Sequence, residues 1–522
     1  MIQLKLEYSG WYRNDFLAVK GFCFDKENRL FIGEELLDFF ADIHTKEDFA
    51  KKLKEANGIF SVVVYQPDFK AVSIDRTRIF PLFYRQNDHD FIVTDNPYSL
   101  LQSDDHISLA AEEEYHHISI VLGNKTLVEN IFQVRPSSFI VIFDDKIEAF
   151  DYVDFLLEEK DEIEKKNAEK LIVSAFENGI KRLISSTKGR QLVVPLSGGY
   201  DSRLIACLLK LHDCENVLCY NVGRRGNPEH QLSQQVAEKL GFSYFFIDNA
   251  DSEFLSDYIQ SADFQRYYRY SGNLSSSFWM YEYFGVKYLK ERCLIADDAV
   301  FIPGHSGDFL GGSQFSKAGV KRSETSKEIV KKLLQNKFSL GDKKIGKQVE
   351  EFVREFVTRS FKKATNPLPY SVFENFDYKE KLPKFINNSV RIYEFFGYET
   401  RLFFWDNEVV DVFRRLPYQL RLNKNFYDKL LENNYFIPLQ LLFARELKVS
   451  KLAMKWQQIK NRAKRLLPAF VTKRINRSTD NTCMKEISAP LQNELQENGQ
   501  IVRGQYNKVF NRWYIMKLKS EL

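Results

Sequence analysis

The sequence lacks several features that are typical of membrane-spanning proteins, secreted proteins and zinc-binding proteins. It has no run of about 18 apolar residues. Its N-terminal stretch MIQLKLEYSGWYRNDF has no basic start followed by an apolar core, so it does not resemble an export signal. The six cysteines form no CxxC pair and lack zinc-type spacing to histidine. We therefore expect a cytoplasmic protein with reduced thiols.

The chain also lacks a strong charge of one sign. A net charge of +4 over 522 residues is too small for a nucleic-acid-binding field, so we expect no nucleic-acid partner. The exception is 448–477, which holds ten Lys or Arg and no Asp or Glu. Trp456, Ile459, Ala463 and Leu466 can share one helical face there. Such a basic amphipathic segment either packs on its own domain or contacts an anionic membrane surface.

The hydrophobic pattern changes along the chain and predicts separate domains. Residues 1–155 hold short apolar or alternating runs typical of strands, at 60–66, 70–75, 91–96 and 138–145. We expect a sheet-rich α+β domain there. A charged connector follows and leads into a predicted helix whose apolar face comprises Leu171, Ile172, Ala175, Phe176 and Ile180.

Strands and helices then alternate. The predicted strands are 191–196, 216–222 and 243–248, and the predicted helices are 202–212 and 227–240, with Asn227 as cap and Pro228 at the first helical position. This alternation predicts an α/β doubly wound parallel sheet. From about 330 the pattern is largely helical. The expected domains are 1–155, 165–450 and a basic helical extension at 451–522.

The loop SGGYDS, residues 197–202, lies between a predicted strand and a predicted helix. Two glycines let an anion approach the backbone, and the N–H groups that begin the helix point at the same spot. A phosphate or pyrophosphate is the expected ligand, although GxxxxGK[ST] and GxGxxG are both absent. Asp201 beside a phosphate would repel it unless a cation lies between them, which predicts Mg²⁺.

A second glycine-rich loop, VFIPGHSGDFLGGS at 300–313, again follows an apolar strand and carries one acidic residue, Asp308. If the two loops face each other across a nucleotide, Asp201 and Asp308 can share the metal. The alternative is that 304–312 is an ordinary surface loop.

These stretches resemble the asparagine synthetase-like family. LSGGYDSRLIACLL is similar to the pyrophosphate loop of ATP-pyrophosphatase synthetases, and GHSGDFLGG to the second metal loop of that family. Residues 398–422 resemble its C-terminal signature and keep Glu399, Arg401, Phe404 and Asp406. Residues 58–85 are similar to its glutaminase-type domain. The resemblance implies an Ntn-hydrolase-like first domain of class II amidotransferase type and a PP-loop, adenine nucleotide alpha hydrolase-like second domain.

The resemblance also implies a reaction and a ligand set. A carboxylate would attack the α-phosphate of MgATP to give an acyl-adenylate and pyrophosphate, and an amine or ammonia would then displace AMP. The implied pyrophosphate and metal residues are Ser197, Gly198, Gly199, Asp201, Ser202 and Asp308. The implied adenosine-site residues are Leu196, Val222 and Gly304, and Lys429, or Lys424, would reach the pyrophosphate.

Three departures from the family pattern bear on the nitrogen source. The glutaminase nucleophile is an N-terminal cysteine, whereas here Met1 precedes Ile2 and the nearest cysteine is Cys23, so we expect no glutamine hydrolysis. His305 stands where the family has an acidic residue; it either acts as a catalytic base or only bonds the loop. The C-terminal lysine pattern is out of register, with Glu432 where arginine is usual.

We therefore expect an ATP- and Mg²⁺-dependent amide ligase without glutaminase activity. The turn NPE and the loop GHSGD resemble variants from bacterial surface polysaccharide synthesis, which favours a uronic-acid sugar as the carboxylate. The nitrogen donor stays open between ammonia and an amino compound. The alternatives are a peptide-modifying relative that closes an amide or lactam, and a nucleotide-binding scaffold without catalysis.

Overall fold

The computed structural model describes residues 2–86, 91–143, 146–341, 344–443 and 480–522. The predicted basic amphipathic segment at 448–477 lies outside these residues. Among the described helices, none combines the length and apolar character needed to cross a bilayer. All six cysteines are described, and all are free thiols.

The N-terminal part of the chain contains two sheets. The larger, seven-stranded sheet has the order β11-β10-β6-β5-β3-β2, with β4 paired to β3, and the smaller has the order β1-β8-β7-β9. The strands are β1 (Ile2–Lys5), β2 (Trp11–Arg13), β3 (Leu17–Phe24), β4 (Leu30–Ile32), β5 (Asn57–Tyr65), β6 (Lys70–Ile74), β7 (Phe83–Gln86), β8 (Phe91–Thr94), β9 (Phe132–Gln133), β10 (Ser138–Phe143) and β11 (Lys146–Asp151).

Strand β5 shows how these layers are held. Val63 packs with Tyr84 and Val93 of the smaller sheet, whereas its neighbours Val62 and Val64 face the opposite way. Successive side chains of a strand point to opposite faces, so an uninterrupted apolar run fits a strand covered on both sides. The sheets therefore lie face to face, with helices over the outer face of the larger one.

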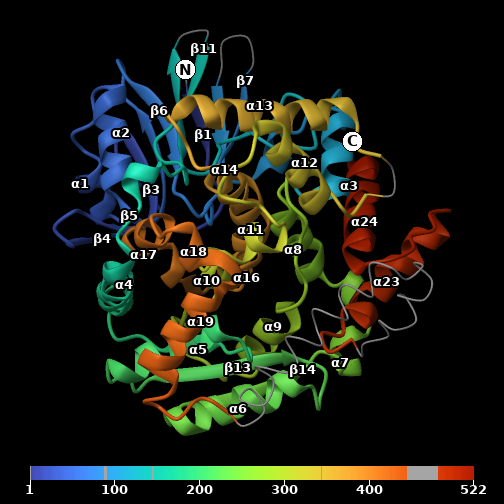
Figure 1. Ribbon diagram of the computed structural model, residues 1–522. Coiled ribbons are helices and arrows are strands. Elements are labelled where there is room, and N and C mark those ends of the chain that lie inside the picture. Colours follow the sequence, from blue (N-terminus) through green and yellow to red (C-terminus); the bar gives the residue numbers. More distant parts are fainter. Residues whose placement is uncertain (1, 87–90, 144–145, 342–343, 444–479) are drawn as a thin grey trace.

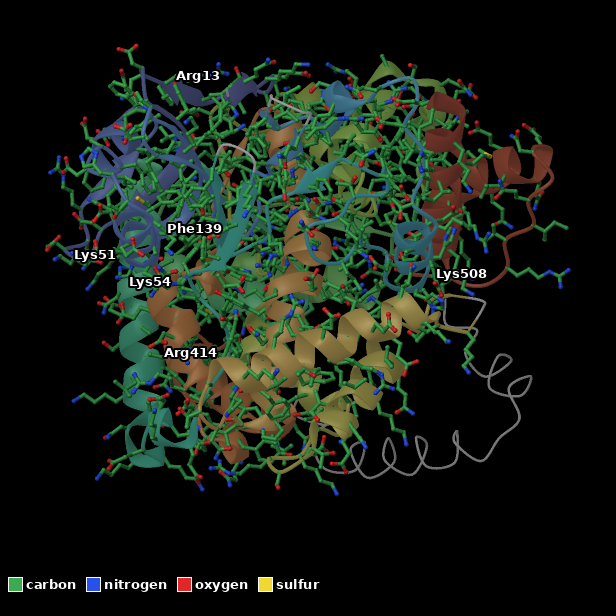
Figure 2. All side chains as sticks on the ribbon, turned by 90° about the horizontal axis from the view of Figure 1, so that it is seen from above. Arg13, Lys51, Lys54, Phe139, Arg414 and Lys508 are labelled. Atoms are coloured by element: carbon green, nitrogen blue, oxygen red, sulfur yellow. The ribbon has the colours of Figure 1, made fainter. Side chains whose placement is uncertain are left out.

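Helix α2 (Lys46–Glu55) is one of these covering helices. Thr45 caps it by accepting a hydrogen bond from the Asp48 backbone N–H at 3.1 Å. Phe49 and Leu53 are one turn apart and buried against the sheet. Lys51 and Lys54 are exposed on its outer side, as Figure 2 shows. The companion helix is α1 (Glu35–Phe39).

The second sheet is parallel throughout, in the order β14-β13-β12-β15-β16. Its strands are β12 (Leu192–Pro195), β13 (Val217–Gly223), β14 (Ser243–Asp248), β15 (Val300–Phe301) and β16 (Glu399–Thr400). The chain runs outward from β12 to β14 and then returns to place β15 on the other side of β12. This reversal makes the gap between the ends of β12 and β15 a topological switch point, where ligands bind in such sheets.

Helices cover both faces of this sheet. Asn221 of β13 contacts Ser233 of α6 (Pro228–Leu240), with 3.4 Å between Nδ2 and Oγ. The next residue, Val222, packs against Gly285 of α9 (Tyr283–Glu291). Since adjacent strand residues point to opposite faces, α6 and α9 lie on opposite sides. The predicted doubly wound parallel sheet is confirmed.

The remaining helices lie between and beside the sheets, as Figure 1 shows. They are α3 (Leu109–Ile118), α4 (Lys165–Thr187), α5 (Tyr200–Leu211), α7 (Ser252–Leu255), α8 (Ala262–Gly272), α10 (Gly307–Leu310), α11 (Ser313–Lys317), α12 (Ser326–Lys337), α13 (Lys347–Lys363), α14 (Pro369–Phe376), α15 (Asn387–Ser389), α16 (Arg391–Phe395), α17 (Asn407–Arg414), α18 (Tyr418–Arg421), α19 (Asn425–Leu431), α23 (Met484–Glu497) and α24 (Tyr506–Glu521). Two π-helices are η4 (Asp377–Ile386) and η7 (Glu432–Phe436), and the 3₁₀ turns are η1 (Pro97–Leu100), η2 (Glu159–Asp161), η3 (Tyr258–Gln260), η5 (Phe403–Trp405) and η6 (Leu422–Lys424). The helical character predicted beyond 330 is thus present in the described residues.

Most predicted elements are found within a few residues of their predicted bounds. Asn227 caps α6 by accepting from His230 N at 2.8 Å, and Pro228 begins the helix, as predicted. The predicted apolar face of α4 is wrong at Leu171, which is 38% exposed, whereas Ile172 and Phe176 are buried. Leu171 adjoins the buried stripe but lies beyond its edge. The predicted domain boundaries stay predictions.

A buried ion pair fixes α18 behind the second glycine-rich loop. The Arg421 guanidinium donates to both Glu374 carboxylate oxygens, at 2.6 and 2.7 Å, and neither side chain is exposed. Arg421 also donates to the carbonyl oxygens of Leu310 and Phe309, at 3.1 and 3.4 Å. The pair therefore satisfies backbone carbonyls of this loop from behind.

Replacing Arg421 by methionine should strongly destabilise the protein. R421M leaves the Glu374 carboxylate buried without its cation, and breaking such a pair costs about 3–5 kcal/mol. Urea unfolding of the full chain measures the change in the free energy of unfolding. The control R359M alters a side chain that is 74% exposed and should change stability by less than about 1 kcal/mol. Equal stability of the two variants would contradict the structural role of the pair.

Candidate active site

The first glycine-rich loop joins β12 to α5 and is held by its own serines. Gly199 is the N-cap of α5. The Ser202 hydroxyl accepts from Ser197 N at 3.1 Å and lies 3.0 Å from the Ser197 hydroxyl, which accepts from Gly199 N at 3.2 Å. The loop thereby wraps the first turn of a twelve-residue helix whose N-terminus favours anions.

The second loop, between β15 and α11, approaches the first at two glycines. A Cβ on Gly304 would lie 2.7 Å from Ser202 N, and one on Gly307 would lie 2.6 Å from the Asp201 carboxyl carbon. Real Cβ atoms do not come so close. Gly304 therefore allows the backbones of the two loops to touch, and Gly307 leaves room for the Asp201 carboxylate.

This contact brings Asp201 and Asp308 together. The Asp308 backbone N–H donates to Asp201 Oδ2 at 2.7 Å, and the Tyr427 hydroxyl donates to Oδ1 at 2.9 Å. Burial raises the pKa of Asp201 to about 6, opposed by Lys424 and assisted by Asp308. Ser313 Oγ orients Asp308 through a 2.8 Å bond. Two neighbouring carboxylates favour a cation bound between them.

The donor set fits Mg²⁺, which takes hard oxygen ligands and keeps several from water or phosphate. Within the described ranges, no group of three or more His, Cys, Asp or Glu residues is suited to hold a metal ion. Asp201 and Asp308 supply two carboxylates, so an ion between them would need further oxygen ligands from phosphate and water. The residues present are thus suited to a metal–phosphate complex.

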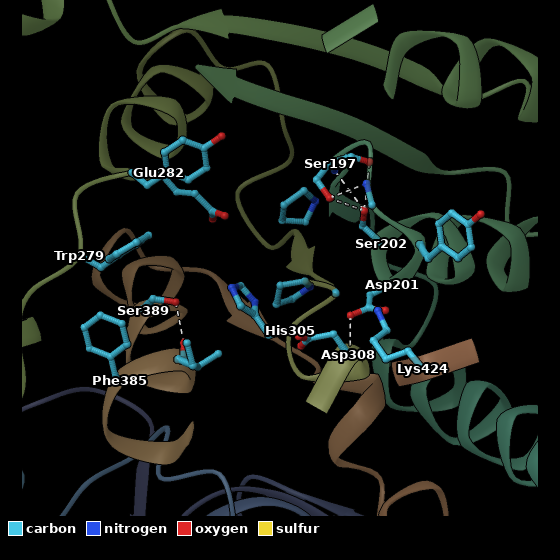
Figure 3. A pocket seen from close by; sticks show the side chains of 17 residues that line it. Ser197, Asp201, Ser202, Trp279, Glu282, His305, Asp308, Phe385, Ser389 and Lys424 are labelled. Carbon is cyan, nitrogen blue, oxygen red and sulfur yellow. Dashed lines mark hydrogen bonds between the residues drawn. The ribbon is translucent and has the colours of Figure 1, made fainter. Parts of the chain in front are cut away.

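Both loops open into one cavity of about 430 Å³, shown in Figure 3. Ser197, Ser202, Asp201, Asp308 and Lys424 lie on one side of it. The opposite side has an aromatic and acidic wall with Trp279, Glu282, Phe385 and Ser389, and Tyr281 and Ile386 also line the cavity. The cavity lies at the switch point between β12 and β15, as predicted for a ligand site in such a sheet.

The protein-family model described as asparagine synthase matches residues 181–469, which is more than half of the chain. The chain belongs to the asparagine synthase family. The resemblance seen in the sequence is thereby confirmed. A domain of this family indicates an ATP-dependent carbon–nitrogen ligase.

No curated protein matches this asparagine synthase family member. Among solved structures, it matches glutamine phosphoribosylpyrophosphate (PRPP) amidotransferase from B. subtilis, complexed with ADP and GMP, at 10% identity and a TM-score of 0.18. The match covers 56% of this chain and 62% of that one, less than two thirds of its length. A TM-score this low supports no conclusion on fold or function.

The structure places the predicted site residues of the asparagine synthase domain at different depths. Ser197, Gly199, Asp201, Ser202, Gly304, His305 and Asp308 line the cavity. Leu196 and Val222 are buried at strand ends, where their carbonyl oxygens accept from Asn221 Nδ2 at 2.8 Å and the Tyr281 hydroxyl at 2.9 Å. The Gly198 carbonyl accepts from Arg203 at 2.9 Å. Leu196, Gly198 and Val222 are therefore not among the residues that line the cavity.

The two candidate lysines are separated by a turn. Lys424 lines the cavity, whereas Lys429 is exposed on α19 and is not among the lining residues. Asn423 and Lys424 both have left-handed backbones, with φ of 58° and 61°, and this turn brings Lys424 close to Gly311 of the second loop. The sequence could not reveal the turn, because neither residue is glycine.

His305 lies between the two sides of the cavity (Figure 3). Burial lowers its pKa to about 4, and Asp308 opposes this shift. The imidazole is therefore neutral near pH 7, and Nδ1 has no hydrogen-bond partner among the described residues. A neutral imidazole with a free nitrogen can accept or donate one hydrogen bond to a ligand.

Other residues of the family signature support the fold away from the cavity. Arg401 is buried and donates to Glu399 at 2.8 Å and to the Ser186 hydroxyl at 2.8 Å. Asp406 caps α17 and accepts from Arg182 at 2.7 Å. These residues tie α4 to α17 and to the edge of the parallel sheet, so their role here is structural.

Replacing Asp201 by asparagine should stabilise the metal-free protein and abolish its response to Mg²⁺. The folded state holds the Asp201 proton up to about pH 6, whereas the unfolded state releases it near 3.8. Stability contributed by this group falls as the pH rises through that window and stays reduced above it. At pH 7.5, D201N should therefore gain on the order of 3 kcal/mol.

Thermal unfolding at pH 7.5 and pH 5, with and without MgATP, measures both effects. The gain from D201N should shrink at pH 5, and MgATP should stabilise the wild type but not D201N. The exposed control D298N should behave as wild type in every condition. A D201N variant that is less stable than the wild type at pH 7.5 would show that the ionised Asp201 carboxylate does not destabilise the ligand-free protein.

Proposed function

We propose that the protein is an ATP-dependent ligase that adenylates a carboxylate, releases pyrophosphate and transfers the acyl group to ammonia or an amine. The observation that carries this proposal is the contact of Asp201 with Asp308 at the N-terminus of α5. Two facing carboxylates beside a phosphate-type loop are suited to a metal-bound polyphosphate. On this basis the first part of the chain is an Ntn-hydrolase-like domain and the second a PP-loop domain.

The residues around the cavity supply the groups that this reaction needs. Mg²⁺, when bound, would neutralise phosphate charge and polarise the phosphate oxygens. Asp201 and Asp308 would hold it, while the N–H groups at the start of α5 and the Lys424 ammonium face the departing pyrophosphate. Stabilising charge that develops on a leaving group is the main electrostatic contribution such a site can make.

A uronic-acid sugar is the favoured carboxylate. The support is the similarity of the NPE turn and the GHSGD loop to variants from bacterial surface polysaccharide synthesis. Trp279 and Phe385 on the far wall also offer aromatic faces against which a sugar ring can stack. The enzyme would work in the cytoplasm. Residues 448–477, which lie outside the described residues, would contact an anionic membrane surface.

A uronate should support pyrophosphate release that depends on Asp201. Glucuronate and galacturonate, free and as their UDP esters, are incubated with the full chain, MgATP and ammonium, and pyrophosphate is measured. D201A removes one of two metal carboxylates and should lower the rate by at least about a hundredfold. The control D298A should retain it. Release with D201A equal to wild type would rule out the metal assignment.

The nitrogen source separates this protein from glutamine-dependent relatives. Because Cys23, the cysteine in the N-terminal sheets, is fully buried in β3, ammonium chloride should support amide formation and glutamine should not. The readout is the mass of the product formed with ¹⁵N-ammonium or with amide-¹⁵N glutamine. Transfer of label from glutamine by the purified protein would contradict the proposal. Acceptance of a peptide carboxylate in place of a uronate would favour the lactam-forming alternative, and binding of MgATP without turnover would favour the scaffold.

A further inference from the structure

Glu282 lines the cavity opposite the metal carboxylates and has no counterpart among the predicted site residues. It is the N-cap residue of α9, placed between β14 and β15 in the chain. Figure 3 shows Glu282 and Trp279 on one side, Asp201, Asp308 and Lys424 on the other, and His305 between them. Its position therefore leaves the phosphate end free and faces whatever fills the other end.

Two tyrosines hold the Glu282 carboxylate by one oxygen. The Tyr220 hydroxyl donates to Oε2 at 3.2 Å, and the Tyr393 hydroxyl donates to the same atom. Phe301 of β15 fixes both rings, stacking on Tyr393 at 4.2 Å and packing edge-on against Tyr220 at 6.0 Å. Glu282 is thus preorganised from β13, β15 and α16.

The other oxygen is available to a ligand. Oε1 has no hydrogen-bond partner among the described residues, and the side chain is only partly buried because it borders the cavity. A carboxylate accepts hydrogen bonds and donates none, so its partner at Oε1 must bring a proton or a positive charge. Trp279 borders the same space, and its ring face attracts cations.

The charges around the cavity decide which substrate meets Glu282. The cavity is lined by three acidic residues, Asp201, Glu282 and Asp308, and by one lysine, Lys424. The anionic substrates, ATP and a carboxylate, are drawn to the end with Lys424, the metal site and the start of α5. An anion at Glu282 would be repelled, whereas a protonated amine would be attracted.

We infer that Glu282 binds the nitrogen donor as its ammonium ion and accepts the first proton from it, so that the donor is a cationic amine. This inference rests on the proposed function, because it assigns the second substrate of that reaction. Glu282 would be a catalytic residue, and Tyr220 and Tyr393 its positioning residues.

The proton transfer makes the nitrogen nucleophilic. One N–H proton of the ammonium moves to Glu282 Oε1, and the nitrogen lone pair so released forms the C–N bond to the acyl carbon. The bond from that carbon to the AMP oxygen breaks, and its electron pair leaves with AMP. The remaining extra proton on nitrogen passes to water. Atoms and charge balance without any oxidant or further reactant.

Binding of a cation at Glu282 can be tested without turnover. Crystals of the full chain are soaked in thallous acetate, because Tl⁺ mimics a monovalent ammonium ion and is located by anomalous scattering. We expect Tl⁺ in contact with Glu282 Oε1 in the wild type and in the control E291Q, and none there in E282Q. Glu291 is exposed at the other end of α9. No ion at Glu282 in the wild type, or the same ion in E282Q, would overturn the inference.

Kinetics with two nucleophiles test the catalytic role. Ammonium is a cation at neutral pH, whereas hydroxylamine is largely uncharged and traps acyl-adenylates as hydroxamates. E282Q should lose roughly tenfold more activity with ammonium than with hydroxylamine, as expected for one lost charge-assisted hydrogen bond. Equal losses, or a higher KM for the carboxylate instead of the amine, would contradict the assignment. If the wild type turns over neither nucleophile, the proposed function fails and the thallium result alone decides this inference.

Discussion

The pairing of β12 with β15 is the constraint on which the site depends. Leu192 and Val193 lie in register with Val300 and Phe301, so the loops that follow these strands leave the sheet side by side. Asp201 and Asp308 are about a hundred residues apart in the sequence, yet the Asp308 backbone N–H donates a 2.7 Å hydrogen bond to the Asp201 carboxylate. The electrostatics of the cavity follow from this register, since both carboxylates and the start of α5 meet there.

A second constraint joins the N-terminal sheets to the rest of the molecule. The π-helix η4 buries Lys384, which donates to the carbonyl oxygens of Val121 and Gly123 at 3.0 and 2.7 Å and to Glu380 at 2.6 Å. Burial lowers the pKa of Lys384 to about 8, opposed by Glu380. The same η4 ends with Phe385 and Ile386 in the cavity wall. The N-terminal part therefore helps to position that wall, which gives it a structural role in the site.

Local signals in the sequence predicted the parallel sheet and the two glycine-rich loops that meet at its edge. The alternation of apolar strands and capped helices, and the glycines around Asp201 and Asp308, depend on neighbours in the chain. The other wall could not be predicted in this way. Glu282 acquires its place through Tyr393, about a hundred residues away, and Lys424 through a left-handed turn without glycine. Leu171 was misplaced because periodicity does not give the width of a buried stripe.

The two ends of the cavity come from separate stretches of the chain, so each end can change by mutation without the other. At the end of the cavity with Asp201 and Asp308, Gly304 and Gly307 of the second loop lie directly against Ser202 and Asp201, so a larger residue at Gly307 would collide with Asp201. The receiving wall comes from a separate stretch, with Trp279, Tyr281 and Glu282 close together ahead of α9. Substitutions in that stretch can change the shape and charge of this wall while the contact between the two glycine-rich loops stays unchanged. A library of variants confined to residues 279–282 would vary this wall alone and leave the loops around Asp201 and Asp308 unchanged.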